Sequence, residues 1–153
     1  MAESLSFDWG TTIVGVLHIE TGEYVPYRST RMIEGARRIS QCRGSVVSFN
    51  GNKCDLAELA KLLELTRLRL RAQHYDMLEI TSSERWPPKP GTSPILGQNL
   101  TDTYVHYFGP EPIVPPPGLT DEYEIANWYD CFKAAQLWRR WRDGLLKSPK
   151  SVA

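Results

Sequence analysis

The sequence of 153 residues lacks three features that would assign it to a class of protein at once. It has no excess of either charge, because 18 basic residues balance 18 acidic ones. It has no apolar run near the roughly 18 residues that cross a membrane. Its three cysteines are odd in number and have no metal-ligand spacing. These absences argue against binding of nucleic acid through net charge, against a membrane protein and against a disulfide scaffold.

The start of the chain, Met-Ala-Glu-Ser, also lacks the basic residues of a secretory signal peptide. Together with cysteines expected to be buried thiols, this favours a cytoplasmic protein. The length suits one domain with a real core, which we expect at residues 1–146. Two proline clusters predict a loop insertion at 82–118, and the polar residues 147–153 predict a disordered tail.

Apolar periodicity and turn residues predict the order of strands and helices. The first three strands, at 5–7, 12–19 and 24–28, follow one another through short turns and form an antiparallel meander. Pro26 places the third of them at an edge. We expect the remaining elements to be helices at 32–41, 54–65 and 123–142, strands at 45–49 and 75–80, and a helix around 94–105 in the insertion.

The strand at 45–49 is the most strand-like run of the chain and is expected to be buried on both faces. Helices must then cover both sides of the sheet. The predicted fold is a three-layer α/β domain with a mixed central sheet, in which the antiparallel meander is followed by parallel strands.

Three aspartates stand in contexts that suit a metal-dependent phosphodiester nuclease. Asp8 ends an apolar run, Asp55 opens a helix after a strand and a turn, and Asp130 lies in the closing helix. Carboxylates gathered at the ends of strands can hold two hard cations for attack on a phosphate. Asp55 could instead cap its helix, and Asp130 could be an ordinary exposed acid.

These residues also carry a resemblance to a known family. Asp8, the run from Val46 to Gly51 with Asp55, the run from His74 to Asp76, and the run from Asn127 to Asp130 resemble, in this order, the DnaQ-like 3′–5′ exonucleases of the ribonuclease H-like superfamily. The branch related to the proofreading domains of family B DNA polymerases is the most similar.

The resemblance implies a ribonuclease H-like fold and hydrolysis of single-stranded DNA or RNA from its ends. It implies two Mg²⁺ or Mn²⁺ ions bound by Asp8, Asp55 and Asp130. It also implies that a second set of residues shapes the site, namely Asn50, Gly51, Asp76 and Asn127.

Two positions depart from the family pattern. Gly10 stands where the family has a metal-binding Glu, and Ala126 stands where it has a Tyr that orients water. The alternative is therefore a catalytically degenerate module that binds nucleic acid, a protein partner or a second copy of itself. Asp8-Trp9-Gly10-Thr11-Thr12 also resembles the first hairpin of the RuvC/YqgF-type nucleases, in which a Gly at this position is normal. A phosphate- or nucleotide-binding domain with this hairpin is a further alternative.

Arginines are grouped in two places, and both are candidates for a phosphate-facing patch. The alternative is that they are solvated side chains at helix ends. The two groups are Arg67, Arg69 and Arg71, and Arg139, Arg140 and Arg142.

Overall fold

One five-stranded mixed sheet forms the centre of the computed structural model, which describes residues 3–83, 99–110 and 112–145. Its strands are β1 (Ser4–Gly10), β2 (Ile13–His18), β3 (Tyr24–Arg28), β4 (Ser45–Ser48) and β5 (Gln73–Asp76). β1 pairs antiparallel with β2 and parallel with β4. β3 and β5 form the two edges, so the spatial order is β3-β2-β1-β4-β5. Pro26 therefore lies on an edge strand, as predicted.

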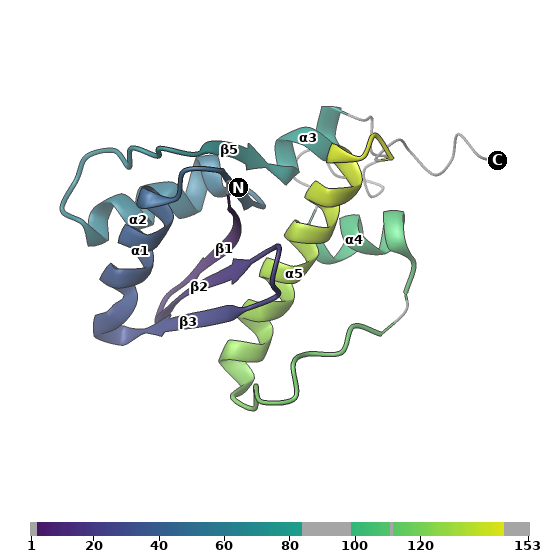
Figure 1. The fold of residues 1–153 in the computed structure, drawn as a ribbon, viewed down its shortest axis with the longest axis horizontal. Coiled ribbons are helices and arrows are strands. Elements are labelled where there is room, and N and C mark those ends of the chain that lie inside the picture. The colour runs from purple at the N-terminus through teal and green to yellow at the C-terminus, as the bar shows by residue number, and fades with distance from the viewer. Residues whose placement is uncertain (1–2, 84–98, 111, 146–153) are drawn as a thin grey trace, which may run out of the picture.

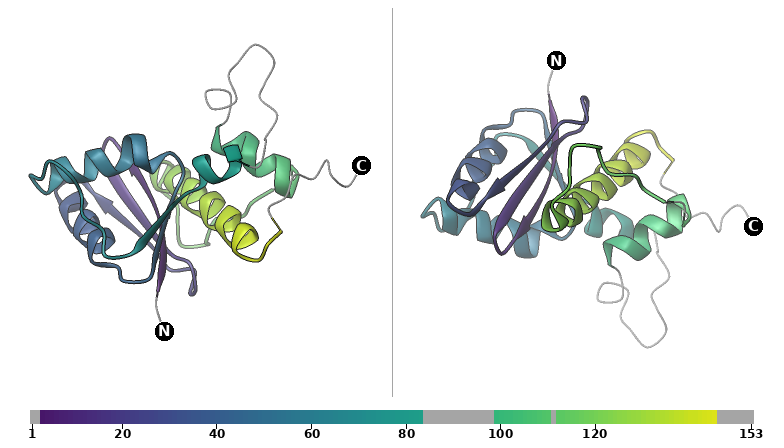
Figure 2. Two further views of the ribbon diagram at one scale, coloured as in Figure 1. Left: turned by 90° about the horizontal axis from the view of Figure 1, so that it is seen from above. Right: turned by 90° about the horizontal axis from the view of Figure 1, so that it is seen from below.

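Helices cover both faces of this sheet. α1 (Met32–Gln41) and α2 (Leu56–Leu62) lie on one face, and α5 (Glu122–Arg142) crosses the other (Figures 1 and 2). A wide helical turn, η2 (Gly51–Asp55), connects β4 to α2, and a short 3₁₀ turn, η1 (Ser29–Arg31), precedes α1. This arrangement confirms the predicted α/β class, with an antiparallel meander, parallel strands and helices on both faces.

β1 separates two apolar cores because its side chains alternate between the faces of the sheet. Leu5 and Phe7 are almost fully buried in the core beneath α1 and α2. Ser6 and Asp8 point the other way, toward α5, where they contact that helix. The two polar residues of β1 therefore belong to the interface between the sheet and the closing helix.

Two sets of hydrogen bonds fix where α5 starts and how it is turned against β1. Asp121 caps the helix, because its Oδ1 accepts from the backbone N–H groups of Tyr123 and Glu124, both at 3.0 Å. Further along the same helix, Ser6 Oγ donates to the carbonyl oxygen of Cys131 at 2.7 Å. This buried bond holds the phase of the helix, and with it the direction in which its polar residues point.

The predicted strand at 75–80 was wrong. β5 ends at Asp76, and α3 (Met77–Ser83) begins at the next residue. The Asp76 carboxylate accepts from the backbone N–H of Leu78 at 3.0 Å, which satisfies a free donor in the first turn of the helix. Short apolar runs of this kind fit the period of a strand and that of a helix equally well, and the hydrogen bond of the Asp76 side chain favours the helix here.

The insertion contains a helix, α4 (Leu100–Phe108), that packs beside α5 (Figure 1). Asn99 caps it by accepting from Asp102 N at 2.8 Å. The predicted helix around 94–105 is therefore found with shifted bounds. Residues 84–98 of the insertion and the predicted tail at 147–153 lie outside the described residues. Within the described part of the chain, no helix is long and apolar enough to cross a membrane.

Candidate functional site

Asp8 lies inside β1, at the centre of the sheet, and not at the end of the strand as its sequence context indicated. Its side chain is half-buried against α5. The amide Nδ2 of Asn127 donates to the Oδ2 of Asp8 and to its backbone carbonyl oxygen, both at 3.1 Å. Asn127, predicted to shape the site, therefore fixes the orientation of the Asp8 carboxylate.

A glycine on the neighbouring strand makes this contact possible. Gly15 of β2 lies directly opposite Asp8 in the antiparallel register. A Cβ atom at Gly15 would lie only 1.5 Å from Oδ1 of Asn127, so the missing side chain is the space into which Asn127 fits. The hydroxyl of Tyr24 then donates to Oδ1 of Asn127 at 2.7 Å. Gly15 and Tyr24 are site residues that sequence reasoning missed.

Asp130 lies one turn after Asn127 on the same face of α5. Besides burial, the negative charge of Asp130 raises the pKa of Asp8, so the two carboxyl groups lie near each other. Burial raises the pKa of Asp130, while the Lys133 ammonium acts in the opposite direction. The strand and the helix thus bring together two acids from opposite ends of the chain, and both line the same clefts.

Asp55 lies at the end of η2, immediately before α2, and its side chain is only 7% exposed. It makes no capping hydrogen bond to α2. Instead, its Oδ2 accepts from the backbone N–H of Trp9 at 3.4 Å, a long contact that turns the carboxylate toward β1. Burial raises the pKa of Asp55 to about 7, and the charges of Asp76 and Asp130 act in the same direction. Capping of the helix does not explain this residue.

Asp8 is influenced by the charges of both other acids. Burial raises its pKa well above the ordinary value, and the negative charges of Asp130 and Asp55 raise it further. Within the described ranges, no Arg or Lys forms an ion pair with any of the three carboxylates. We call Asp8, Asp55 and Asp130 the carboxylate cluster. Three acids without a paired cation are costly in a folded protein, which makes a bound cation the natural counter-charge.

Asp76 organises the turn beside the cluster. Its Oδ1 accepts from the backbone N–H of Asn50 at 2.7 Å, and its Oδ2 accepts from that of Asn52 at 3.1 Å. Asn50 adopts a left-handed conformation with φ of 68°. At Gly51, a Cβ atom would lie 2.2 Å from Oγ of Ser48, so only glycine fits. Asn50, Gly51 and Asp76 therefore act as a unit that shapes this turn.

Two clefts meet at Asp8 and Asp130. A cleft of about 320 Å³ is lined by both acids together with Phe49, Asn50 and Leu100. A second cleft, of about 630 Å³, is lined by the same two acids. Asp8 and Asp130 are therefore accessible to a ligand from both clefts.

The two positions at which this sequence differs from the pattern of the DnaQ-like exonucleases both lie in the larger cleft. Gly10 is on the same face of β1 as Asp8, two residues further along, and Ala126 precedes Asn127 on α5. Both line the cleft of about 630 Å³. A Cβ atom at Gly10 would lie 2.9 Å from Cγ2 of Ile13, so a larger residue there requires that side chain to shift. The cleft is therefore open at the two positions where the family has larger polar side chains.

The carboxylate cluster is not a preformed metal centre. Among the described residues, no group of three or more His, Cys, Asp or Glu side chains is arranged to hold a metal ion. Asp8 and Asp130 line the same two clefts, whereas Asp55 lines neither of them and acts on Asp8 by its charge. The chemistry of the donors suits a hard divalent cation, but Asp55 would have to approach the other two to share one.

The raised pKa of Asp55 predicts how stability depends on pH. The folded chain holds this proton up to about pH 7, whereas an unfolded carboxyl releases it near its ordinary value of 3.8. The free energy of unfolding should therefore decrease as the pH rises from 4 to 8, by up to about 4 kcal/mol from this group. Urea unfolding at pH 5 and pH 8 measures the decrease, which should be smaller in Asp55→Asn. The exposed acid Glu23, changed to Gln, is the control, and an equal pH dependence in all three proteins would contradict the assignment.

Comparisons of this chain with protein-family models, with curated proteins and with solved structures give no match.

Proposed function

We propose that this chain is a metal-dependent nuclease of the ribonuclease H-like type that hydrolyses phosphodiester bonds at the 3′ ends of single-stranded DNA or RNA. One observation carries the proposal: Asp8, Asp55 and Asp130 come from three distant parts of the sequence, and yet the charges of Asp130 and Asp55 raise the pKa of Asp8 and the charge of Asp130 raises that of Asp55, with no ion pair to a described Arg or Lys. The sheet, with its antiparallel meander and two parallel strands, supports it.

Two Mg²⁺ or Mn²⁺ ions, when bound, would supply Lewis-acid activation of the phosphate and of a water molecule. Asp8 and Asp130, which line both clefts, would hold the ions, and Asp55 would complete the set. A cation would compete with the proton that the raised pKa of Asp8 favours, because both occupy the same oxygen atoms. Asn127 would keep Asp8 in its orientation during this exchange, through its donor contact to Oδ2.

A second candidate is a degenerate module that binds single-stranded nucleic acid or a protein partner without cleaving it. Gly10 and Ala126 favour it, because these two positions of the cleft beside Asp8 carry neither the Glu nor the Tyr of the exonuclease pattern. General acid–base groups contribute roughly 10²–10⁴-fold to rates, so cleavage by such a site would be slow. The RuvC/YqgF-type alternative differs from the first proposal in the substrate that it accepts. An endonuclease of that type would cut a circular strand, which has no ends, whereas an exonuclease would not.

The test is cleavage of 5′-labelled single-stranded DNA and RNA with Mn²⁺, with Mg²⁺ and with EDTA. The proposal predicts a ladder of products shortened from the 3′ end with either metal and none with EDTA. A circular single strand of the same sequence is the matched control and should remain intact. Cleavage of the circle would favour the endonuclease alternative. Cleavage in EDTA, or none with either metal, would contradict the proposal.

A further inference from the structure

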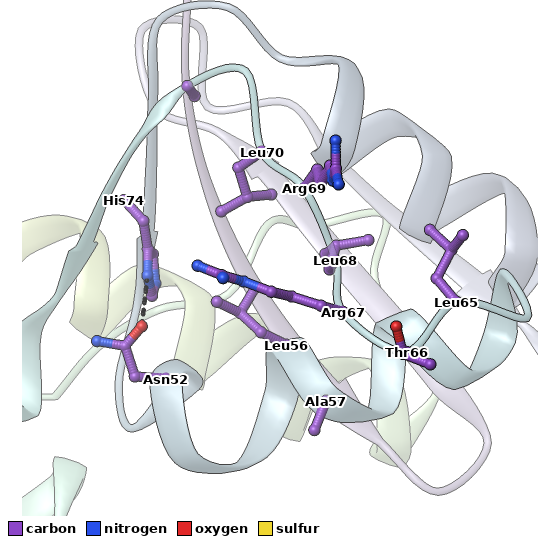
Figure 3. A pocket seen from close by; sticks show the side chains of 11 residues that line it. Asn52, Leu56, Ala57, Leu65, Thr66, Arg67, Leu68, Arg69, Leu70 and His74 are labelled. Carbon is purple, nitrogen blue, oxygen red and sulfur yellow. Dashed lines mark hydrogen bonds between the residues drawn. The ribbon is translucent and has the colours of Figure 1, made fainter.

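A large pocket lies away from the carboxylate cluster, between α2 and the connection that leads into β5 (Figure 3). Its volume is about 1160 Å³, somewhat above the roughly 300–1,000 Å³ typical of ligand sites. Most of its wall comes from consecutive residues of the connection. The lining residues used below are Arg67 and Arg69, Leu56, Leu68 and Leu70, and Asn52 and His74.

Two arginines give this pocket a positive charge that nothing in the described ranges balances. Arg67 and Arg69 are exposed, and neither forms an ion pair or hydrogen bond with another described side chain. Figure 3 shows the Arg67 side chain extending across the pocket toward Asn52 and His74. A guanidinium group free of protein partners and directed into a concave site suits a phosphate or a carboxylate.

The second arginine group, predicted as an equal candidate, is engaged in contacts within the fold. Arg139 donates to the carbonyl oxygen of Ile19 at 2.6 Å. Arg140 lies over the ring of Phe108, and Arg142 lies 4.7 Å above the ring of Trp138. These residues stabilise α5, so the group at 67–71 is the better anion site.

The rest of the pocket combines an apolar wall with a polar edge. Leu56, Leu68 and Leu70 form the wall, which suits a flat apolar group such as a nucleobase. The polar edge is rigid, because His74 bonds to Oγ of Ser48 at 2.7 Å and to Oδ1 of Asn52 at 3.1 Å. The pocket therefore offers charge and an apolar surface side by side, which are the two properties of a nucleotide.

One turn connects this pocket to the carboxylate cluster. Asp76 accepts from the backbone N–H groups of both Asn50 and Asn52. Asn52 lines the pocket, whereas Asn50 lines the cleft that contains Asp8 and Asp130. The two sites are thus on opposite sides of a turn of three residues, and a ligand with several linked units can reach from one to the other.

We propose that this pocket binds a nucleoside phosphate, with Arg67 and Arg69 on its phosphate and the leucine wall against its base. That the nucleotide belongs to the single strand cleaved at the carboxylate cluster rests on the proposed function. A free nucleotide has the same chemistry and would occupy the same pocket. The site raises the affinity for the strand and takes no part in cleavage.

The test is fluorescence anisotropy with a labelled single strand of ten nucleotides in EDTA, so that neither cleavage nor metal contributes. Arg67→Ala and Arg69→Ala together should weaken binding about tenfold, as expected for loss of charged hydrogen bonds. The slope of log affinity against log salt should fall by about 0.7 for each arginine removed. Arg37→Ala, which removes an exposed charge from α1, is the control and should change neither affinity nor competition.

Unlabelled AMP and an unlabelled strand, added as competitors, separate the two sources of the nucleotide. Displacement of the labelled strand by both competitors indicates a pocket that accepts free nucleotides, and displacement by the unlabelled strand alone indicates a strand subsite. Either result supports the proposal if the competitor no longer displaces the labelled strand from the double variant. Binding by the double variant equal to that of the native chain would overturn it, as would a native chain that binds neither ligand. Cleavage with Mn²⁺ is measured separately, so loss of one activity with retention of the other shows which of the two proposals fails.

Discussion

Asp8→Asn should lower the rate of metal-dependent cleavage by about a thousandfold, the order expected when metal activation worth several kcal/mol is lost. The reason is that Asp8 accepts a hydrogen bond from Asn127, has its pKa raised by the charge of Asp130, and lines both clefts with that residue. The substitution keeps the shape of the side chain and leaves an oxygen to accept from Asn127. Initial rates on a 5′-labelled strand with Mn²⁺ measure the effect.

The same variant should fold at least as well as the native chain. Removal of one acid from a cluster whose pKa values are raised by burial and by like charge relieves repulsion. Thermal unfolding at pH 8 checks this, and Asp143→Asn, at an exposed acid beyond α5, is the matched control. A variant Asp8→Asn that cleaves at the native rate, or loses activity only because it unfolds, would contradict the assignment.

Gly15→Ala should destabilise the fold by about 3 kcal/mol and reduce activity with it. The added Cβ would lie 1.5 Å from Oδ1 of Asn127 and 2.6 Å from its Cγ, so Asn127 must move. Overpacking of this kind costs roughly 1–3 kcal/mol, and a buried polar group that loses its partner costs about as much. Tyr24 and Asp8 would both lose their contact with Asn127. Urea unfolding measures the change.

A double-mutant cycle separates this clash from a general effect of alanine in a strand. Asn127→Ala removes the two atoms nearest to the new Cβ and leaves only Cε1 of Tyr24, at 3.0 Å, within the range of a tight contact. In that background, Gly15→Ala should cost less than about 1 kcal/mol, which leaves a large coupling energy between the two sites. Additive costs would show that the space at Gly15 is not what admits Asn127.

Local patterns in the sequence predicted most of the fold. The helix at 32–41 and the strand at 24–28 have the predicted bounds. They are bounded by turn residues and have one clear period, so neighbouring elements do not alter them. The segment at 75–80, by contrast, does not have one clear period. There the carboxylate of Asp76 starts a helix through contacts made two residues along the chain and with the turn at Asn50.

The candidate site was only partly accessible from the sequence. Asp8, Asp55 and Asp130 could be named because acids beside apolar runs are unusual; in the structure Asp8 and Asp130 line the same clefts, Asp55 acts on Asp8 by its charge, and their role as metal ligands stays a prediction. The pairing of Gly15 with Asn127 could not be found, because it depends on the register of β2 against β1 and on the phase of α5. A glycine within a strand was the available signal, since such a glycine often marks a close approach of another group.

The arginine pocket depends on a connection without regular structure. Its shape follows from Leu68 and Ala72, which are buried in the core under α1 and α2 and hold the connection against the sheet. Alternation of Leu and Arg in this stretch indicates an amphipathic segment but not the cavity beside it. The sequence therefore identified the charges, and only the fold shows which of the two arginine groups is free to bind a ligand.

The central claim is that the carboxylate cluster binds divalent cations, and calorimetric titration of Mn²⁺ into the native chain and into Asp8→Asn tests it most directly. A cation that binds Asp8 should displace the proton that the raised pKa of this residue favours, so the heat should depend on the ionisation enthalpy of the buffer. The native chain is predicted to bind Mn²⁺ with release of protons near pH 7, and Asp8→Asn is predicted to lose both. Equal binding by the two proteins, or no binding by the native chain, would contradict the claim.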